Sequence, residues 1–110
     1  MEFGQFIAVP YCSQPLADGG AHVIKIEALE GDPVRTLNPL APGETRHFLS
    51  RNRGKHSLPL NLRHPSASRV IEALLARADV VLTNFRPGLA RELGLDHATL
   101  APRYPRLIVG

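Results

Sequence analysis

The chain has 110 residues, of which 44% are hydrophobic and 21% charged, so it is long enough for one folded domain and too apolar for a disordered segment. Thirteen lysines and arginines stand against ten acidic residues, and the net charge of +3 favours anionic ligands without identifying one. A single cysteine excludes a disulfide framework and indicates a reducing compartment, and we expect the Cys12 thiol to be buried. With no signal-like start and no long apolar run, the sequence predicts a cytoplasmic protein without a membrane partner.

Hydrophobic periodicity and turn residues divide the chain into short strands and helices. The stretch 28–49 is rich in proline and glycine, which predicts a long loop, and Pro59 is compatible only with an edge strand. In chain order, we expect a strand end at 2–7, a helix at 13–17 capped by Ser13, a buried strand at 23–27, the loop at 28–49, an edge strand at 57–62, a helix at 65–78 with Pro65 at its first position, a strand at 80–83, short helices at 87–94 and 96–100, and a strand at 107–109.

This alternation of strands and helices predicts an α/β fold, a Rossmann-like parallel sheet with helices on both faces. The pattern starts inside one strand and stops inside another, so we expect a sheet truncated at both ends, with residues 1–110 forming part of a larger domain. Ligands of open α/β sheets bind outside the carboxyl ends of the strands. That rule selects residues 5–9, the segment after Glu27, and residues 84–86.

A basic stretch without acidic residues runs from Thr45 to Ile71. Its cations are Arg46, Arg51, Arg53, Lys55, Arg63 and Arg69. Three interpretations are open: a solvated face, a phosphate-binding loop around Asn52–Lys55, and a nucleic-acid surface. The last is the weakest because only Phe48 could stack on a base.

Other site types find little support in the sequence. Glu27 ends a strand about twenty residues after the first turn, as in dinucleotide-binding folds, but that turn contains no G-x-G-x-x-G. The five histidines are scattered without the spacing of metal ligands, so we expect no metal. No combination of nucleophile, base and orienting group is present in the sequence.

Four segments nevertheless occur in an order and spacing that can be compared with known families: Val23–Glu27, Gly31–Arg35, Asn52–Ser57 and Ala78–Gly88. Their sequences and spacing resemble the N-terminal part of the family III CoA-transferases, which include formyl-CoA transferase, carnitine CoA-transferases and α-methylacyl-CoA racemase. The resemblance runs from about Glu2 to Gly110. It implies part of a coenzyme A site and an interlocked homodimer in the full-length enzymes.

The resemblance assigns this site residue by residue. Phe6, Ile7 and Ala8 would lie on the pantetheine and adenine side, Leu60 and Arg63 near the adenine and phosphates, and Asn84, Phe85 and Arg86 near the pantetheine arm. For Phe85, core packing is an equal alternative. The arginine expected to meet a CoA phosphate is displaced by one position, to Arg91, which is about 100° around a helix.

The function implied is transfer of coenzyme A between an acyl-CoA and a carboxylic acid, with the racemase branch left open. The family's catalytic aspartate lies beyond the last residue here, so we expect this chain alone to be inactive. The competing hypothesis is a small nucleotide- or RNA-binding module that uses residues 46–63. The resemblance makes nucleic acid the less favoured partner.

Overall fold

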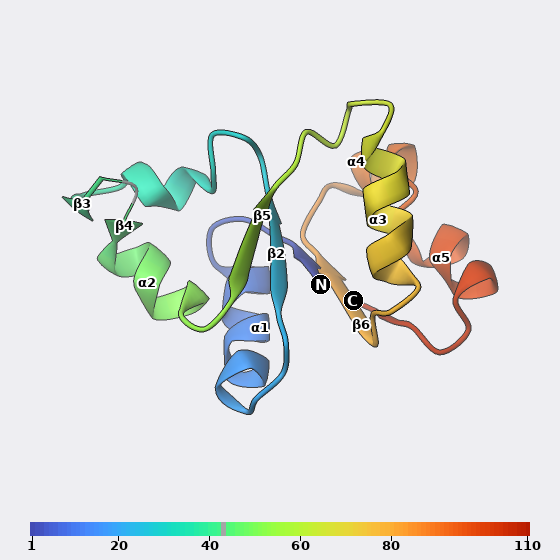
Figure 1. The fold of residues 1–110 in the computed structure, drawn as a ribbon, viewed down its shortest axis with the longest axis horizontal. Coiled ribbons are helices and arrows are strands. Elements are labelled where there is room, and N and C mark those ends of the chain that lie inside the picture. The colour runs from blue at the N-terminus through green and yellow to red at the C-terminus, as the bar shows by residue number, and fades with distance from the viewer. Residues whose placement is uncertain (43) are drawn as a thin grey trace.

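A five-stranded sheet forms the centre of the molecule, and every adjacent pair of its strands is parallel (Figure 1). The computed structural model describes residues 1–42 and 44–110. The strands of this sheet are β1 (Glu2–Phe3), β2 (Ile24–Glu27), β5 (His56–Pro59), β6 (Val80–Thr83) and β7 (Ile108–Val109). Their spatial order is β5-β2-β1-β6-β7, so the chain reverses direction across the sheet at β1. The topological switch point therefore lies between β1 and β6, where such sheets bind ligands.

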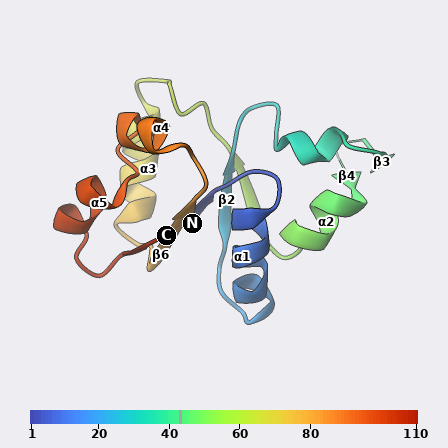
Figure 2. The same cartoon turned by 180° about the vertical axis from the view of Figure 1, so that it is seen from behind.

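Helices cover both faces of this sheet, which confirms the predicted α/β class. In Figures 1 and 2 the strands separate two groups of helices, with α1 and α2 on one side and α3, α4 and α5 on the other. Their bounds are α1 (Ala8–Asp18), α2 (Arg46–Asn52), α3 (Ala67–Leu75), α4 (Pro87–Glu92) and α5 (His97–Arg103). A 3-10 helix (Pro33–Thr36) and the antiparallel pair β3 (Pro39–Ala41) and β4 (Glu44–Thr45) connect β2 to α2. No helix within the described ranges is long and apolar enough to cross a bilayer.

The two faces of the sheet differ in chemistry. Successive residues of a strand point to opposite faces. Phe3 and Ile26 point toward α3, where they join a buried apolar core with Val81 and Leu75. The other face carries Glu2, Lys25 and Glu27, which are also buried. The strand expected at 23–27 is therefore buried on both faces, as predicted, but one of these faces is charged.

The first helix is longer than predicted. It begins at Ala8 rather than Ser13 and contains Pro15 in its interior. Ser13 is not an N-cap but a buried residue within the helix, and its hydroxyl donates a hydrogen bond to Glu2. This contact and the burial of Val9 hold the helix against the sheet despite the hydrogen bond that Pro15 removes. Cys12 lies on the exposed side of the same helix, so the prediction of a buried thiol is also wrong.

The predicted loop at 28–49 contains regular structure because short-range caps stabilise it. Asp32 Oδ1 accepts a hydrogen bond from the Val34 N–H and begins the 3-10 helix, and Thr45 Oγ1 accepts one from Phe48 N–H and begins α2. Gly43 belongs to this predicted loop and lies outside the described residues. Further along, α3 begins after Ser66 as N-cap, so Pro65 precedes the helix instead of starting it.

Candidate functional site

A cleft of about 310 Å³ opens at the carboxyl ends of β5, β2, β1 and β6. Its apolar lining comes from Phe3, Ile26, Ala28, Leu29, Leu60, Leu62 and Phe85, and its polar lining from Gln5, Glu27, Glu30, Asn61 and Arg63. This volume falls at the small end of the range for ligand pockets, about 300–1,000 Å³. The cleft combines an apolar wall with the cation of Arg63 and with two carboxylates, of which that of Glu27 is paired with Arg35.

The structure brings three of the sequence-predicted residues together in this cleft: Leu60, Arg63 and Phe85. Leu60 and Arg63 follow β5, whereas Phe85 follows β6, on the other side of β1. Phe85 also packs against the core, with its ring centroid 6.4 Å from that of Phe3. Phe85 therefore both packs against the core and lines the cleft, and its contact with a ligand stays a prediction.

The other predicted residues lie near the same edge of the sheet without lining the cleft. Phe6 and Ile7 are 48% and 58% exposed in the turn after β1, and Ala8 begins α1. The Asn84 side chain is hydrogen-bonded to the backbone of Gln5. The remaining two belong to α4, where both are exposed: Arg86 is the N-cap, and Arg91 lies in the last turn.

A network of charged side chains is buried beneath α1. Glu2 lies at its centre, with its carboxylate oxygens 3.0 Å from Lys25 Nζ and 3.0 Å from Lys55 Nζ. Asp32 Oδ2 lies 3.0 Å from the same Lys25 nitrogen. Burial lowers the pKa of Lys55 from its ordinary value, although Glu2 acts in the opposite direction. Lys55 is thus turned into the protein, so the phosphate-binding interpretation of residues 52–55 loses this lysine, whereas the Arg53 side chain is 58% exposed.

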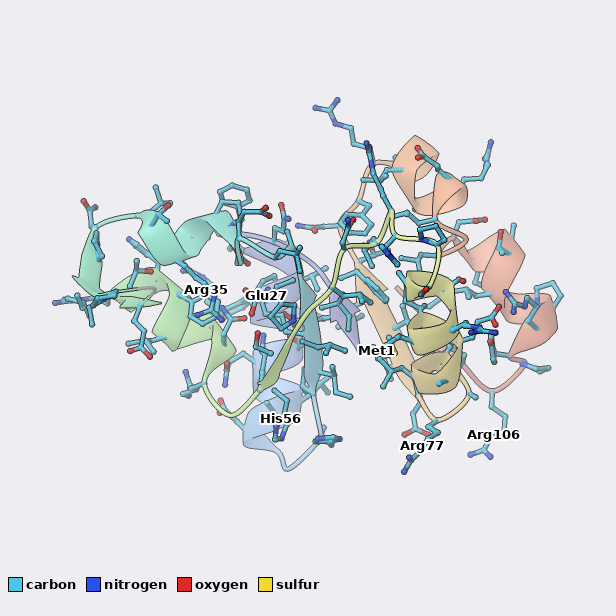
Figure 3. The ribbon with its side chains drawn as sticks, turned by 45° about the horizontal axis from the view of Figure 1, so that its top comes forward. Met1, Glu27, Arg35, His56, Arg77 and Arg106 are labelled. Carbon is cyan, nitrogen blue, oxygen red and sulfur yellow. The ribbon has the colours of Figure 1, made fainter. Side chains whose placement is uncertain are left out.

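A second buried pair fixes the chain after β2. Arg35 Nε and Nη2 donate to the two carboxylate oxygens of Glu27 at 2.9 and 2.8 Å, and Figure 3 shows the two side chains meeting between the 3-10 helix and β2. Gly31 allows this approach, because a Cβ there would lie 2.8 Å from Arg35 Cδ and its φ is +85°. Burial alone would raise the pKa of Glu27, but hydrogen bonds from Arg35, Ser57 and the Asp32 N–H outweigh it and lower the pKa to about 2. Glu27 is therefore a structural anion that fixes the chain after β2.

Three cations of the basic stretch have partners within the chain. Arg51 Nη1 donates to the His47 carbonyl oxygen, Arg53 pairs with Asp18, and Lys55 is buried. The rings of His22 and His56 do meet, with centroids 4.6 Å apart. Within residues 1–42 and 44–110, however, no group of three or more histidine, cysteine or acidic side chains could hold a metal ion.

The family model for CoA-transferase family III matches residues 1–110, the whole chain. The chain belongs to this family. Among curated relatives, it is 43% identical over 105 residues to the succinyl-CoA–L-malate CoA-transferase beta subunit of Chloroflexus aurantiacus, a match that covers 94% of this chain and 26% of that protein. It is 38% identical over 113 residues to the cinnamoyl-CoA:phenyllactate CoA-transferase of Clostridium sporogenes, covering 98% of this chain and 27% of that protein.

The fold comparison agrees with this membership of family III. A crystal structure of a CAIB/BAIF family protein from Brucella suis matches with a TM-score of 0.88 and 38% identity, over 97% of this chain and 30% of that one. The chain thus spans about a quarter of the length of the curated CoA-transferases it matches. The family assignment and the parallel sheet are confirmed. The roles of the individual site residues stay predictions.

Proposed function

We propose that this chain supplies part of the coenzyme A pocket of an acyl-CoA:carboxylate CoA-transferase. The observation that carries the proposal is the cleft at the carboxyl ends of the strands, because it places Arg63 beside the apolar wall of Leu60 and Phe85. In this arrangement Arg63 would meet a phosphate of coenzyme A, and the apolar side chains would contact the adenine and the pantetheine arm.

The start of α1 supports a ligand on the same edge. Ile7 is the N-cap of this helix but has no side chain that accepts from the first turn. The first N–H groups of a helix attract anionic or carbonyl oxygens when no cap satisfies them. In the proposed complex, Phe6, Ile7 and Ala8 would therefore face the ligand from the side opposite β5. Arg86 and Arg91 would complete the site from α4. Asn84, which follows β6, would act on the site through its hydrogen bonds to the backbone of Gln5.

The covalent chemistry would come from a part of the enzyme outside the matched quarter, because Glu27 is held by Arg35 and Glu30, the other carboxylate of the cleft lining, is exposed in a turn. Covalent transfer needs a carboxylate that can attack a thioester. Glu27 lines the cleft, but both of its oxygens are held by Arg35. We further propose that full-length subunits form an interlocked homodimer, which acts in the cytoplasm on an acyl-CoA and a carboxylic acid. This chain alone would have no activity.

Titration of coenzyme A into the purified chain, at low and high salt, tests the pocket. We expect weak binding that high salt reduces and that is equal for coenzyme A and acetyl-CoA, since only the coenzyme would be contacted. Arg63→Ala should weaken binding at low salt by about fivefold, the worth of one exposed charged hydrogen bond. Arg69→Ala is the matched control, because Arg69 is an exposed cation on α3 that does not line the cleft. Equal effects of the two variants would contradict the proposal.

The expected inactivity is tested separately. The chain is incubated with several acyl-CoA donors and carboxylate acceptors, and exchange of labelled coenzyme A is measured. No turnover is expected. Turnover that Glu27→Gln or Glu30→Gln abolishes would place the catalytic group inside this chain and contradict the assignment.

A further inference from the structure

The turn after β1 is held by a side chain from the far side of the switch point. Asn84 Nδ2 donates a hydrogen bond to the Gln5 carbonyl oxygen at 2.9 Å, and the Gln5 N–H donates to Asn84 Oδ1 at 3.2 Å. The two residues are 79 positions apart in the sequence. Asn84 thus uses both ends of its amide to clamp one residue of backbone, joining the loop after β6 to the turn after β1.

The other side of this turn is anchored as well. The Phe6 N–H lies 3.4 Å from Asp32 Oδ1, and Asp32 is itself buried against Lys25. Gly4 lets the turn pass close to α1, because a Cβ on it would lie 2.2 Å from Val9 Cβ. The turn therefore runs between two fixed points, the Asn84 amide and the Asp32 carboxylate.

Between these anchors the backbone of Phe6 is strained. Its φ is +63°, in the left-handed region that aromatic residues rarely occupy. Packing does not explain this conformation, because the Phe6 side chain is 48% exposed and that of Ile7 is 58% exposed. The hydrogen bonds from the two anchors are the contacts that hold it. Strain of this kind persists only where the surroundings impose it, and it concentrates at ligand sites.

We propose that Asn84 is a positioning residue of the coenzyme A site, which acts by holding Phe6 in its left-handed conformation rather than by contacting the ligand. Gln5, the residue it clamps, lines the cleft, whereas Asn84 does not. Release of the clamp lets Phe6 relax to a negative φ and moves Ile7 and the start of α1 away from the ligand. The inference rests on the proposed coenzyme A pocket.

The test is a double-mutant cycle between Asn84 and Phe6. Asn84→Ala and Phe6→Gly are made singly and together, and each protein is titrated with coenzyme A. Asn84→Ala should weaken the binding of coenzyme A about tenfold, because most molecules would leave the left-handed conformation of Phe6 once the clamp is released. Glycine adopts φ of +63° without strain, so Asn84→Ala should weaken binding much less in the Phe6→Gly background. If Asn84 touched the ligand directly, its loss would be the same in both backgrounds, and that result would overturn the proposal.

Amide hydrogen exchange reports on the clamp without any ligand. The Gln5 N–H should exchange about fivefold faster in Asn84→Ala, because one hydrogen bond is lost, and at the parent rate in Arg63→Ala, which alters the cleft but not the turn. Asn84→Asp keeps the acceptor and should preserve this protection in part. Unchanged Gln5 exchange in Asn84→Ala would overturn the positioning role. If the parent chain does not bind coenzyme A at all, the proposed pocket is also overturned, whereas exchange still shows whether the clamp exists.

Discussion

Replacing Glu2 by glutamine should destabilise the chain far more than the same replacement at its surface. Glu2 is fully buried, with Lys25 and Lys55 each 3.0 Å from its carboxylate. The Asp32 carboxylate is the other anion in contact with Lys25. Glutamine has almost the same volume, so it creates no cavity. It does leave the ammonium groups of Lys25 and Lys55 buried with Asp32 as the remaining carboxylate of this network.

The size of the effect follows from the geometry. Opposite charges 3.0 Å apart attract by about 5 kcal/mol at an effective dielectric constant of about 20. Desolvation offsets much of this, but the lysines remain desolvated in the variant, and removal of one partner from a buried pair typically costs about 3–5 kcal/mol. We expect a loss in that range. It is a large part of the roughly 5–15 kcal/mol that stabilises a typical domain.

Urea unfolding followed by circular dichroism measures this loss. The control is Glu72→Gln: Glu72 Oε1 lies 2.7 Å from Arg103 Nη2, but the side chains are 53% and 49% exposed, so the expected loss is about 0–1 kcal/mol. The double variant Glu2→Gln/Lys55→Met removes one charge of each sign, so it should be more stable than Glu2→Gln alone. Equal losses for the two glutamine variants, or a double variant less stable than the single one, would refute the reasoning.

Three further predictions follow from single contacts. The pKa of Glu27 is about 2 when folded and 4.5 ordinarily, so its contribution is complete above about pH 4.5 and is lost as the pH falls toward 2. Glu27→Gln should lower the free energy of unfolding by about 3 kcal/mol at pH 7 and by much less near pH 2, and a pH-independent difference would contradict this. Gly4→Ala should cost about 1–3 kcal/mol in urea unfolding, because its Cβ would overlap Val9, whereas Gly88→Ala meets nothing within 4 Å and should be neutral or stabilising. Ile108 is 65% exposed on the edge strand β7, so the chain should self-associate in sedimentation experiments, and Ile108→Lys should reduce that association.

Two strands of the main sheet were predicted closely, whereas β3 and β4 lie within the predicted loop and were missed. The predicted strand at 80–83 coincides with β6, and the one at 23–27 exceeds β2 by a single residue. The charged face of the sheet was not predictable. Glu2 meets Lys25 only because β1 and β2 pair in that register, and a register between separate strands is not written in either segment.

The candidate site was predictable in part. The rule that ligands bind at the carboxyl ends of strands selected the segment after Glu27 and residues 84–86, which include Phe85, whereas Leu60 and Arg63 came from the family resemblance. The hydrogen bonds between the Asn84 amide and the backbone of Gln5 were not predictable, because nothing in either residue type indicates that partner. A positive φ at Phe6 is equally invisible, because phenylalanine is a residue from which no such conformation is expected.

The acidic residues nearest the cleft support the proposal that this part of the fold shapes a coenzyme site without performing the reaction. Glu27 remains ionised at neutral pH, since its pKa is about 2, and Arg35 holds both oxygens, so it is neither an effective base nor a free nucleophile. Asp32 is buried against Lys25 and caps the 3-10 helix. These anions fix the chain after β2, which forms one wall of the cleft. Glu30 also lines the cleft and is exposed, so it is the carboxylate at which a claim of catalysis within this chain would have to be tested.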